Sequence, residues 1–287
     1  MATETDPSSL QESLGPGSHA EVAPATANIR TEQAPSPASG LSARASQIRA
    51  MFSTIAPTYD RLNHVLSFSI DRLWRHHTVR RTLALAEPTR RADRPWRVLD
   101  VCAGTGDLSL AFARRLSQVG GGRVVALDYS HAMLTQIASK SRAAHVEPSL
   151  PVEADALRLP LADGGFDLAT VAFGLRNLVD RPAGLREMAR VVRPGGVVAV
   201  LEFSRPRNRL LRALYGFYLS RLLPAVGNRW SRSRAYTYLA DTIEAFPSPE
   251  EVLDWMRQAN LEHIEAEPLT GGIAFLYTGV IPCRSNE

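Results

Sequence analysis

The sequence predicts an α/β fold with a doubly wound, mostly parallel sheet. Apolar segments of strand length alternate with helical segments from residue 97 to residue 203, and this alternation is typical of parallel sheets with helices on both faces. The first strand runs directly into a glycine turn and a helix start. The last two strands, at about 262–268 and 273–280, are separated only by a short Thr-Gly-Gly turn. The sheet is therefore expected to end in an antiparallel hairpin.

The glycine turn in the segment RVLDVCAGTGDLSL most clearly indicates a ligand. Gly104 and Gly106 let the backbone turn sharply and come close to a bound molecule. Thr105 and Asp107 lie where the next helix begins and presents free backbone N–H groups. The dinucleotide-binding fingerprint is only half met, because Ser109 stands at its third glycine position. A strand-to-helix turn without a ligand is the alternative.

Two acids follow the next two strands. Asp128 lies about 22 residues after Gly106, near the spacing at which an acid at a strand end binds ribose hydroxyls; a helix cap near Ser130 is its alternative role. Asp155 follows a short third strand, where its carboxylate or the backbone at Ala156 can contact an adenine edge, unless it only forms an Asx turn. Ligands of open α/β sheets bind beyond the carboxyl ends of the strands, so the three strand ends predict one cofactor pocket.

The fourth and fifth strands complete the predicted parallel sheet. The fourth, at 166–173, leads into the segment FGLRN, which places Arg176 and Asn177 on the cofactor side of the sheet. A helix at about 182–192 and an Arg-Pro-Gly-Gly turn at 193–196 precede the fifth strand, VVAVLEF. Further along, Ser248 is expected to cap a helix whose first residue is a proline.

Composition divides the chain into parts of different character. Residues 1–45 are rich in Ala, Ser, Pro, Thr and Glu with almost no aromatics, so they are expected to form a disordered arm. Residues 46–92 are predicted to form a helical segment or lid, in which Tyr59 follows a proline break and can project into a pocket. Residues 93–287 are expected to form the main domain, with a helical insert at 205–247.

Charge and cysteine content limit the class of protein. The chain has 287 residues, a net charge of +4 and a pI near 9.4, and Lys140 is its only lysine. Its two cysteines make neither a disulfide framework nor a metal cluster, so no metal is expected and a reducing cytoplasm fits best. No apolar run approaches the ~20 residues needed to cross a bilayer. The sequence has no basic motif interleaved with aromatic residues, so nucleic acid is not expected as a partner.

These features occur within a longer resemblance. From about residue 50 to residue 280 the chain resembles the ubiquinone/menaquinone biosynthesis C-methyltransferases, a branch of the class I methyltransferases that depend on S-adenosylmethionine (SAM). The glycine turn alone indicates only a methyltransferase, whereas the opening segment together with FGLRN and TGGIA is far more specific. The resemblance rests on MFSTIAPTYDRLNHVLSFSIDRLWR, VLDVCAGTGDLS, the strand end at Asp128, FGLRN, the RPGG turn, LEFSRP, YTYLADTI and TGGIA.

The resemblance implies a Rossmann-like fold with a seven-stranded sheet and SAM as the cofactor. Thr105, Asp128, and Asp155 with Ala156 match the positions that contact SAM in such proteins. One position departs from the pattern, since relatives can place a SAM-contacting serine where this chain has Ala172. One hydrogen bond is typically worth ~0.5–1.5 kcal/mol, so cofactor binding is expected to survive the change.

The implied reaction is methylation of an electron-rich quinol ring, which needs placement and a proton path more than elaborate machinery. Arg176 and Asn177 are the candidates to orient the quinol oxygen and stabilise developing phenolate charge. Tyr59 and Asp107 are the candidates for the proton path. Three of these residues have a purely structural alternative. Arg176 can pair with a structural carboxylate, Asn177 can cap the next helix, and Asp107 can complement a helix N-terminus.

The segment 205–234 contains eight arginines and no acid. Such a basic amphipathic helix can lie on an anionic bilayer or line a tunnel for a polyprenyl tail. A helix packed on the sheet with solvated arginines is the alternative. The predicted apolar face comprises Leu210, Leu211, Leu214, Tyr215, Tyr218, Leu222 and Leu223, opposite Arg209, Arg212, Gly216 and Ser220.

Three functions are compatible with these observations. The first is SAM-dependent C-methylation of a polyprenyl quinol, with demethylmenaquinol favoured over a benzoquinol because the arginine-rich chain reads as bacterial. The second is methylation of another lipophilic small molecule, and the third is a catalytically silent SAM-binding scaffold. The expected partners are the quinol, the membrane surface and a second copy of the chain. The expected location is the cytoplasm, with contact to the inner face of the membrane.

Overall fold

The computed structural model describes residues 46–54, 56, 69–90, 92–206, 208–218, 221 and 235–283. The predicted arm at 1–45 lies outside these residues, as do Tyr59, Ser220, Leu222 and Leu223. A helix at 46–54 comes first. The elements that follow are α2 (Ile70–Ala86), η1 (Glu87–Thr89), β1 (Trp96–Val101), α3 (Asp107–Leu116), β2 (Gly122–Asp128), α4 (His131–Leu134), α5 (Ile137–Ala143), β3 (Leu150–Glu153), β4 (Phe166–Ala172), η2 (Leu175–Asn177), α6 (Arg181–Val191), β5 (Val192–Phe203), α7 (Arg209–Phe217), α9 (Ala235–Glu244), α10 (Pro249–Gln258), β6 (Glu262–Leu269), η4 (Thr270–Gly272) and β7 (Ala274–Val280).

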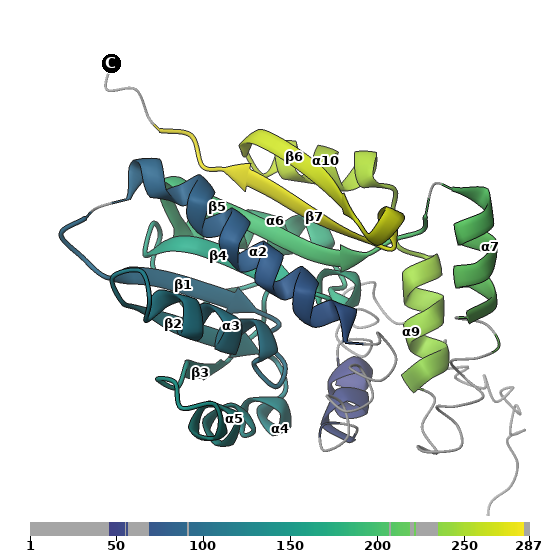
Figure 1. The fold of residues 1–287 in the computed structure, drawn as a ribbon, viewed down its shortest axis with the longest axis horizontal. Helices are drawn as coiled ribbons and strands as arrows, with labels where there is room; N and C mark the ends of the chain where they lie inside the picture. The colour runs from purple at the N-terminus through teal and green to yellow at the C-terminus, as the bar shows by residue number, and fades with distance from the viewer. Residues whose placement is uncertain are drawn as a thin grey trace, which may run out of the picture. The chain divides into compact units, whose positions relative to one another are not determined.

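The strands form one seven-stranded sheet in the order β3-β2-β1-β4-β5-β7-β6. Strands β1 to β5 pair in parallel, whereas β7 is antiparallel to both β5 and β6. This arrangement confirms the predicted doubly wound sheet and its antiparallel ending (Figure 1). The parallel pairing brings the carboxyl ends of β1 to β5 to one edge of the sheet.

Helices cover both faces of the sheet (Figure 1). On one face α2 and α3 pack against the parallel strands, and their apolar side chains surround Val98 and Leu168. On the other face α6 and α10 pack, around Leu99 and Ala169. Successive residues of a strand point to opposite faces, so the adjacent apolar residues Val98 and Leu99 of β1 are explained by burial on both faces of the sheet.

Two predicted boundaries differ from the structure. The Arg-Pro-Gly-Gly segment at 193–196 was predicted to be a turn that closes a helix, but it belongs to β5. The prediction was wrong because β4 and β5 pair with a register shift, from Phe166↔Val192 to Leu168↔Val197, which accommodates the extra residues. The fourth strand also ends one residue earlier than predicted, since Phe173 turns away with φ 57°.

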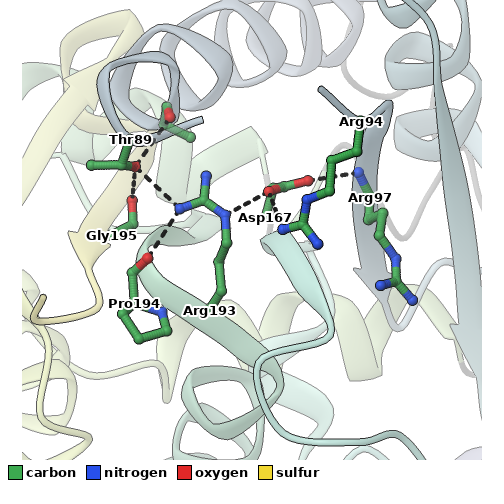
Figure 2. A network of polar contacts seen from close by, with 8 residues as sticks. Thr89, Arg94, Arg97, Asp167, Arg193, Pro194 and Gly195 are labelled. Atoms are coloured by element: carbon green, nitrogen blue, oxygen red, sulfur yellow. Dashed lines mark hydrogen bonds and ion pairs between the residues drawn. The ribbon is translucent and has the colours of Figure 1, made fainter. Parts of the chain in front are cut away.

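A buried carboxylate connects the elements at the amino edge of the sheet (Figure 2). Asp167, at 2% exposure, accepts a hydrogen bond from Arg193 Nε at 2.6 Å and from the backbone N of Arg97 at 2.9 Å. Arg94 Nη2 lies 3.3 Å from the same carboxylate. Arg193 also donates to Thr89 Oγ1 at 3.3 Å. The network therefore joins β1, β4, β5 and η1 away from the carboxyl edge.

Replacing this carboxylate by an amide should destabilise the fold strongly. In Asp167→Asn the buried Arg193 guanidinium loses its counter-charge, and we expect the free energy of unfolding to fall by ~3–5 kcal/mol in urea denaturation. Asp163→Asn is the matched control, because its side chain is 79% exposed and pairs with Arg190 at 2.6 Å. An exposed pair of this kind is worth at most ~1 kcal/mol, so equal losses in the two variants would contradict the assignment.

Candidate functional site

A pocket lies at the carboxyl ends of β1, β2, β3 and β4, and we call it the strand-end pocket. It is lined by residues from the turn after each of these four strands. Of the residues predicted to form the functional site, the structure brings five into its wall: Gly104, Asp128, Asp155, Ala156 and Asn177. The three strand ends that the sequence singled out therefore meet in one cavity, together with the end of the fourth strand.

The glycine turn has the backbone conformation that its sequence requires. Gly104 has φ 57° and Gly106 has φ 86°, a left-handed region that favours glycine. A Cβ on Gly106 would lie 2.9 Å from Ile137 Cγ1, whereas a Cβ on Gly104 would meet no atom within 4 Å. A residue with a side chain could not be accommodated at Gly106, because Ile137 of α5 packs directly against it. Gly104 leaves open space in the strand-end pocket, which a ligand can approach closely.

Asp128 joins the turns that follow β1 and β2. Its Oδ2 accepts a hydrogen bond from Gly104 N at 2.8 Å, and its Oδ1 accepts one from Ser130 N at 2.8 Å. Burial raises the pKa of this carboxyl, while the backbone hydrogen bonds oppose the shift. The N-cap of α4 is Ser130 itself. Each carboxylate oxygen has a second lone pair, so Asp128 keeps acceptor capacity on the wall of the pocket.

Asp155 and Ala156 lie side by side on the pocket wall after β3. Asp155 Oδ1 accepts a hydrogen bond from Leu157 N at 2.9 Å, which is the local pattern of an Asx turn. The Asx turn and the position on the pocket wall, which the sequence offered as alternatives, therefore occur together at Asp155.

Arg176 and Asn177 follow β4 but face different surroundings. The Arg176 side chain is 5% exposed and pairs with the fully buried Glu202, with 2.5 Å between Nη1 and Oε1. Glu202 also accepts a hydrogen bond from Arg176 N at 3.1 Å. This geometry favours the structural alternative for the guanidinium. Asn177, by contrast, lines the strand-end pocket.

The orientation of the Asn177 amide is set by a residue to which sequence reasoning gave no role. Tyr238 of α9 donates its hydroxyl to Asn177 Oδ1 at 3.1 Å. An amide whose oxygen accepts this bond directs its NH₂ group elsewhere. Tyr238 belongs to the segment YTYLADTI, but 61 residues separate it from Asn177, so no local spacing could indicate the contact.

Asp107 and Thr105 lie in a charged cluster beside the glycine turn. Asp107 begins α3 and forms an ion pair with Lys140 of α5, and Arg75 Nη2 of α2 lies 3.9 Å from its other oxygen. Lys140 Nζ also donates to Thr105 Oγ1 at 3.0 Å. Thr105 is 2% exposed. For Asp107 this environment favours the alternative of a carboxylate that complements a helix N-terminus over a role in the proton path.

The helix at 46–54 packs over the strand-end pocket. Phe52 is among its lining residues, as is Arg49, whose guanidinium lies 4.8 Å from the ring centroid of Tyr129 and pairs with Glu153. Ser53 Oγ lies 3.0 Å from Ser130 Oγ. These contacts join the helix to the ends of β2 and β3.

Asp100 is a buried acid beneath the glycine turn that sequence reasoning missed. It lies in β1 at 1% exposure and accepts a hydrogen bond from Ser109 Oγ at 2.6 Å. Burial raises its pKa to about 7, against the lowering effect of the Ser109 bond. The available signals were an acid inside an apolar strand and a serine in place of a fingerprint glycine. The hydrogen bond between the two side chains explains both departures, because Ser109 provides the donor that the buried Asp100 needs.

Comparisons with known proteins agree with this architecture. The ubiE/COQ5 methyltransferase family matches residues 41–281. The ubiquinone/menaquinone biosynthesis C-methyltransferase UbiE of Geobacter sulfurreducens is 41% identical over 244 residues, covering 83% of this chain and 90% of that protein. A demethylmenaquinone methyltransferase of Parafrankia sp. is 40% identical over 259 residues, covering 85% and 97%. A SAM-dependent methyltransferase structure from Thermotoga maritima aligns with a TM-score of 0.53 at 18% identity, covering 81% of this chain and 99% of that one, and shares the fold.

The raised pKa of Asp100 should make stability depend on pH. Between its unfolded value near 3.8 and its folded value of about 7, the folded state holds a proton that the unfolded state has released. The free energy of unfolding therefore falls as pH rises through this window, by an amount on the order of a few kcal/mol.

Asp100→Asn removes this titration while keeping an acceptor for Ser109. Urea denaturation should show the variant to be more stable than the parent at pH 8, with a clearly smaller gain at pH 5. An equal difference at both pH values would show that Asp100 does not titrate in this window.

Proposed function

The chain belongs to the ubiE/COQ5 methyltransferase family, and from this we propose that it transfers a methyl group from SAM to a ring carbon of a polyprenyl quinol, preferring demethylmenaquinol. The observation that carries the proposal is the similarity to quinone C-methyltransferases over more than four fifths of the chain. The strand-end pocket supports it, because four strand ends converge on a cavity lined mostly by apolar side chains.

The residues around the pocket fit SAM as the cofactor. Asp128 offers carboxylate lone pairs at the end of β2, where ribose hydroxyls bind in such sheets. Gly104 has no side chain to block the approach, and Asp155 with Ala156 borders the adjoining wall, where we place the adenine. Gly106 and Thr105 belong to the same turn and contact α5, Gly106 by close packing and Thr105 by its hydrogen bond with Lys140. When bound, SAM supplies an electrophilic methyl group on its sulfonium.

We assign the contact with the quinol oxygen to Asn177. Tyr238 engages the amide oxygen, so the NH₂ group is left to stabilise charge that develops on the phenolic oxygen. The buried Arg176–Glu202 pair anchors the segment that contains Asn177, so Arg176 acts on the substrate through the position of Asn177. Tyr59 lies outside the described residues and is proposed for the proton path on the sequence alone.

A transfer assay with two quinols tests the proposed reaction. Purified protein and methyl-labelled SAM should methylate reduced demethylmenaquinone, and more slowly its benzoquinol counterpart. In Asn177→Ala we expect kcat to fall by a factor of about 10²–10³, while the Kd for SAM stays within twofold. Absence of transfer to either quinol would refute the proposal, and a preference for the benzoquinol would correct the substrate.

Helix α7 supports peripheral contact with an anionic membrane, from which a polyprenyl substrate is available. Leu210, Leu214 and Phe217 are 71%, 60% and 64% exposed and lie within one face of the helix. Leu211 and Tyr215 are half-buried, so the protein covers only part of the apolar face. Among the helices the structure describes, none is long and apolar enough to span a membrane. We propose that the uncovered leucines and phenylalanine enter the lipid surface, where nearby arginines meet its phosphates.

Liposome sedimentation tests the membrane contact. Binding to vesicles that contain anionic lipid should decrease as salt rises, and it should decrease further in the double variant Leu210→Ser, Phe217→Ser. Leu150→Ser is the matched control, because Leu150 is 62% exposed but lies on β3. Binding that is insensitive to salt and to the α7 substitutions would leave α7 as a surface helix packed on the protein.

A further inference from the structure

The only lysine of the chain lies beside the glycine turn. Lysine and arginine together number 33, and 32 of them are arginine. The single exception, Lys140, lies in α5 with its side chain 23% exposed. A chain that uses arginine at nearly every basic position has a lysine at this one, which directs attention to what the ammonium group contacts.

The Lys140 ammonium contacts Thr105 and Asp107, which follow each other closely in the glycine turn and the helix start. Its Nζ donates to Thr105 Oγ1 at 3.0 Å and forms an ion pair with Asp107. Thr105 lies between the two left-handed glycines, and Asp107 is the first residue of α3. A compact cation thus bridges the interior of the turn and the start of the helix that follows it.

The geometry explains why lysine suits this position better than arginine. An ammonium is a compact charge with three rotatable donors, so it can bond a hydroxyl and a carboxylate that lie close together. A guanidinium is planar and longer, and its donors are fixed in a fork. Arg75 Nη2 also approaches the same Asp107 carboxylate, from α2, at 3.9 Å.

We propose that Lys140 is a positioning residue for the cofactor. Through its contacts with Asp107 and Thr105, Lys140 holds the glycine turn in the conformation that binds SAM. The inference rests on the proposed cofactor site. Gly104 lies in the same turn, and its N–H group is directed to Asp128. A shift of the turn would therefore move both the Gly104 backbone and the carboxylate that we assign to the ribose. Lys140 is not among the residues that line the strand-end pocket, so the proposed effect on SAM is indirect.

Binding of SAM and of S-adenosylhomocysteine by titration calorimetry tests the role of Lys140. Lys140→Met keeps most of the length of the side chain and removes its charge, and we expect Kd to rise at least about tenfold. Lys140→Arg should restore part of the affinity, because it returns the charge without the compact geometry. Arg142→Met, an exposed position on the same helix, is the control and should leave Kd within twofold. In the transfer assay the KM for SAM should rise in Lys140→Met, while the KM for the quinol stays constant.

A double-mutant cycle separates positioning from general destabilisation. If Lys140 acts through Asp107, Asp107→Asn alone should weaken SAM binding, and adding Lys140→Met should weaken it little further. The urea midpoint of each variant without ligand, measured alongside, should change far less than Kd. Additive losses in Kd, or losses in Kd that follow the urea midpoint, would overturn the positioning role.

Asp128→Ala distinguishes failure of this inference from failure of the proposed site. It should raise the Kd for SAM at least as much as Lys140→Met. If Asp128→Ala weakens binding and Lys140→Met does not, the cofactor site stands and the role of Lys140 is refuted. If Asp128→Ala has no effect, the proposed cofactor site itself is wrong.

Discussion

The strand-end pocket depends on the two hydrogen bonds that Asp128 accepts from the backbone. One comes from Gly104 in the turn after β1 and the other from Ser130 after β2. A single carboxylate thereby fixes the distance between two neighbouring strand ends, each of which contributes a wall of the cavity. The pairing of β1 with β2 carries this constraint down the sheet, since Val101 pairs with Leu127 directly before the two turns. The position of the pocket follows from strand pairing, and its shape follows from this carboxylate.

Asp100 and Asp128, two buried acids near the carboxyl edge of the sheet, accept hydrogen bonds, whereas a buried acid at the amino edge is paired with arginines. Burial raises the pKa of both Asp100 and Asp128. At the amino edge, Asp167 is compensated by Arg193, Arg94 and a backbone N–H. The comparison indicates that the site retains polar groups at a cost in stability, and that compensated charge elsewhere helps the fold tolerate that cost.

Much of the fold could be predicted from the sequence because its signals are local. Apolar runs identified the strands, and glycines marked the turn after β1. The boundary of β5 was missed, since the register shift beside Val192 depends on the partner strand. The pocket-lining acids were found because each ends a strand. The contact of Tyr238 with Asn177, and that of Asp100 with Ser109, join residues whose pairing arises only when helices dock on the sheet or turn back over it.

The distribution of lysine and cysteine has a practical consequence for handling the protein. Amine-reactive reagents that attach proteins to sensor chips or beads can react with a single lysine side chain, that of Lys140, besides an N-terminal amine, and a tether at Lys140 would lie against the turn that we assign to the cofactor. Thiol chemistry offers a safer attachment point, because Cys283 is exposed near the end of β7. The other thiol, Cys102, is partly buried in the wall of the strand-end pocket, and burial raises its pKa, which suppresses the reactive thiolate. Maleimide coupling should therefore leave the cofactor turn open to solution.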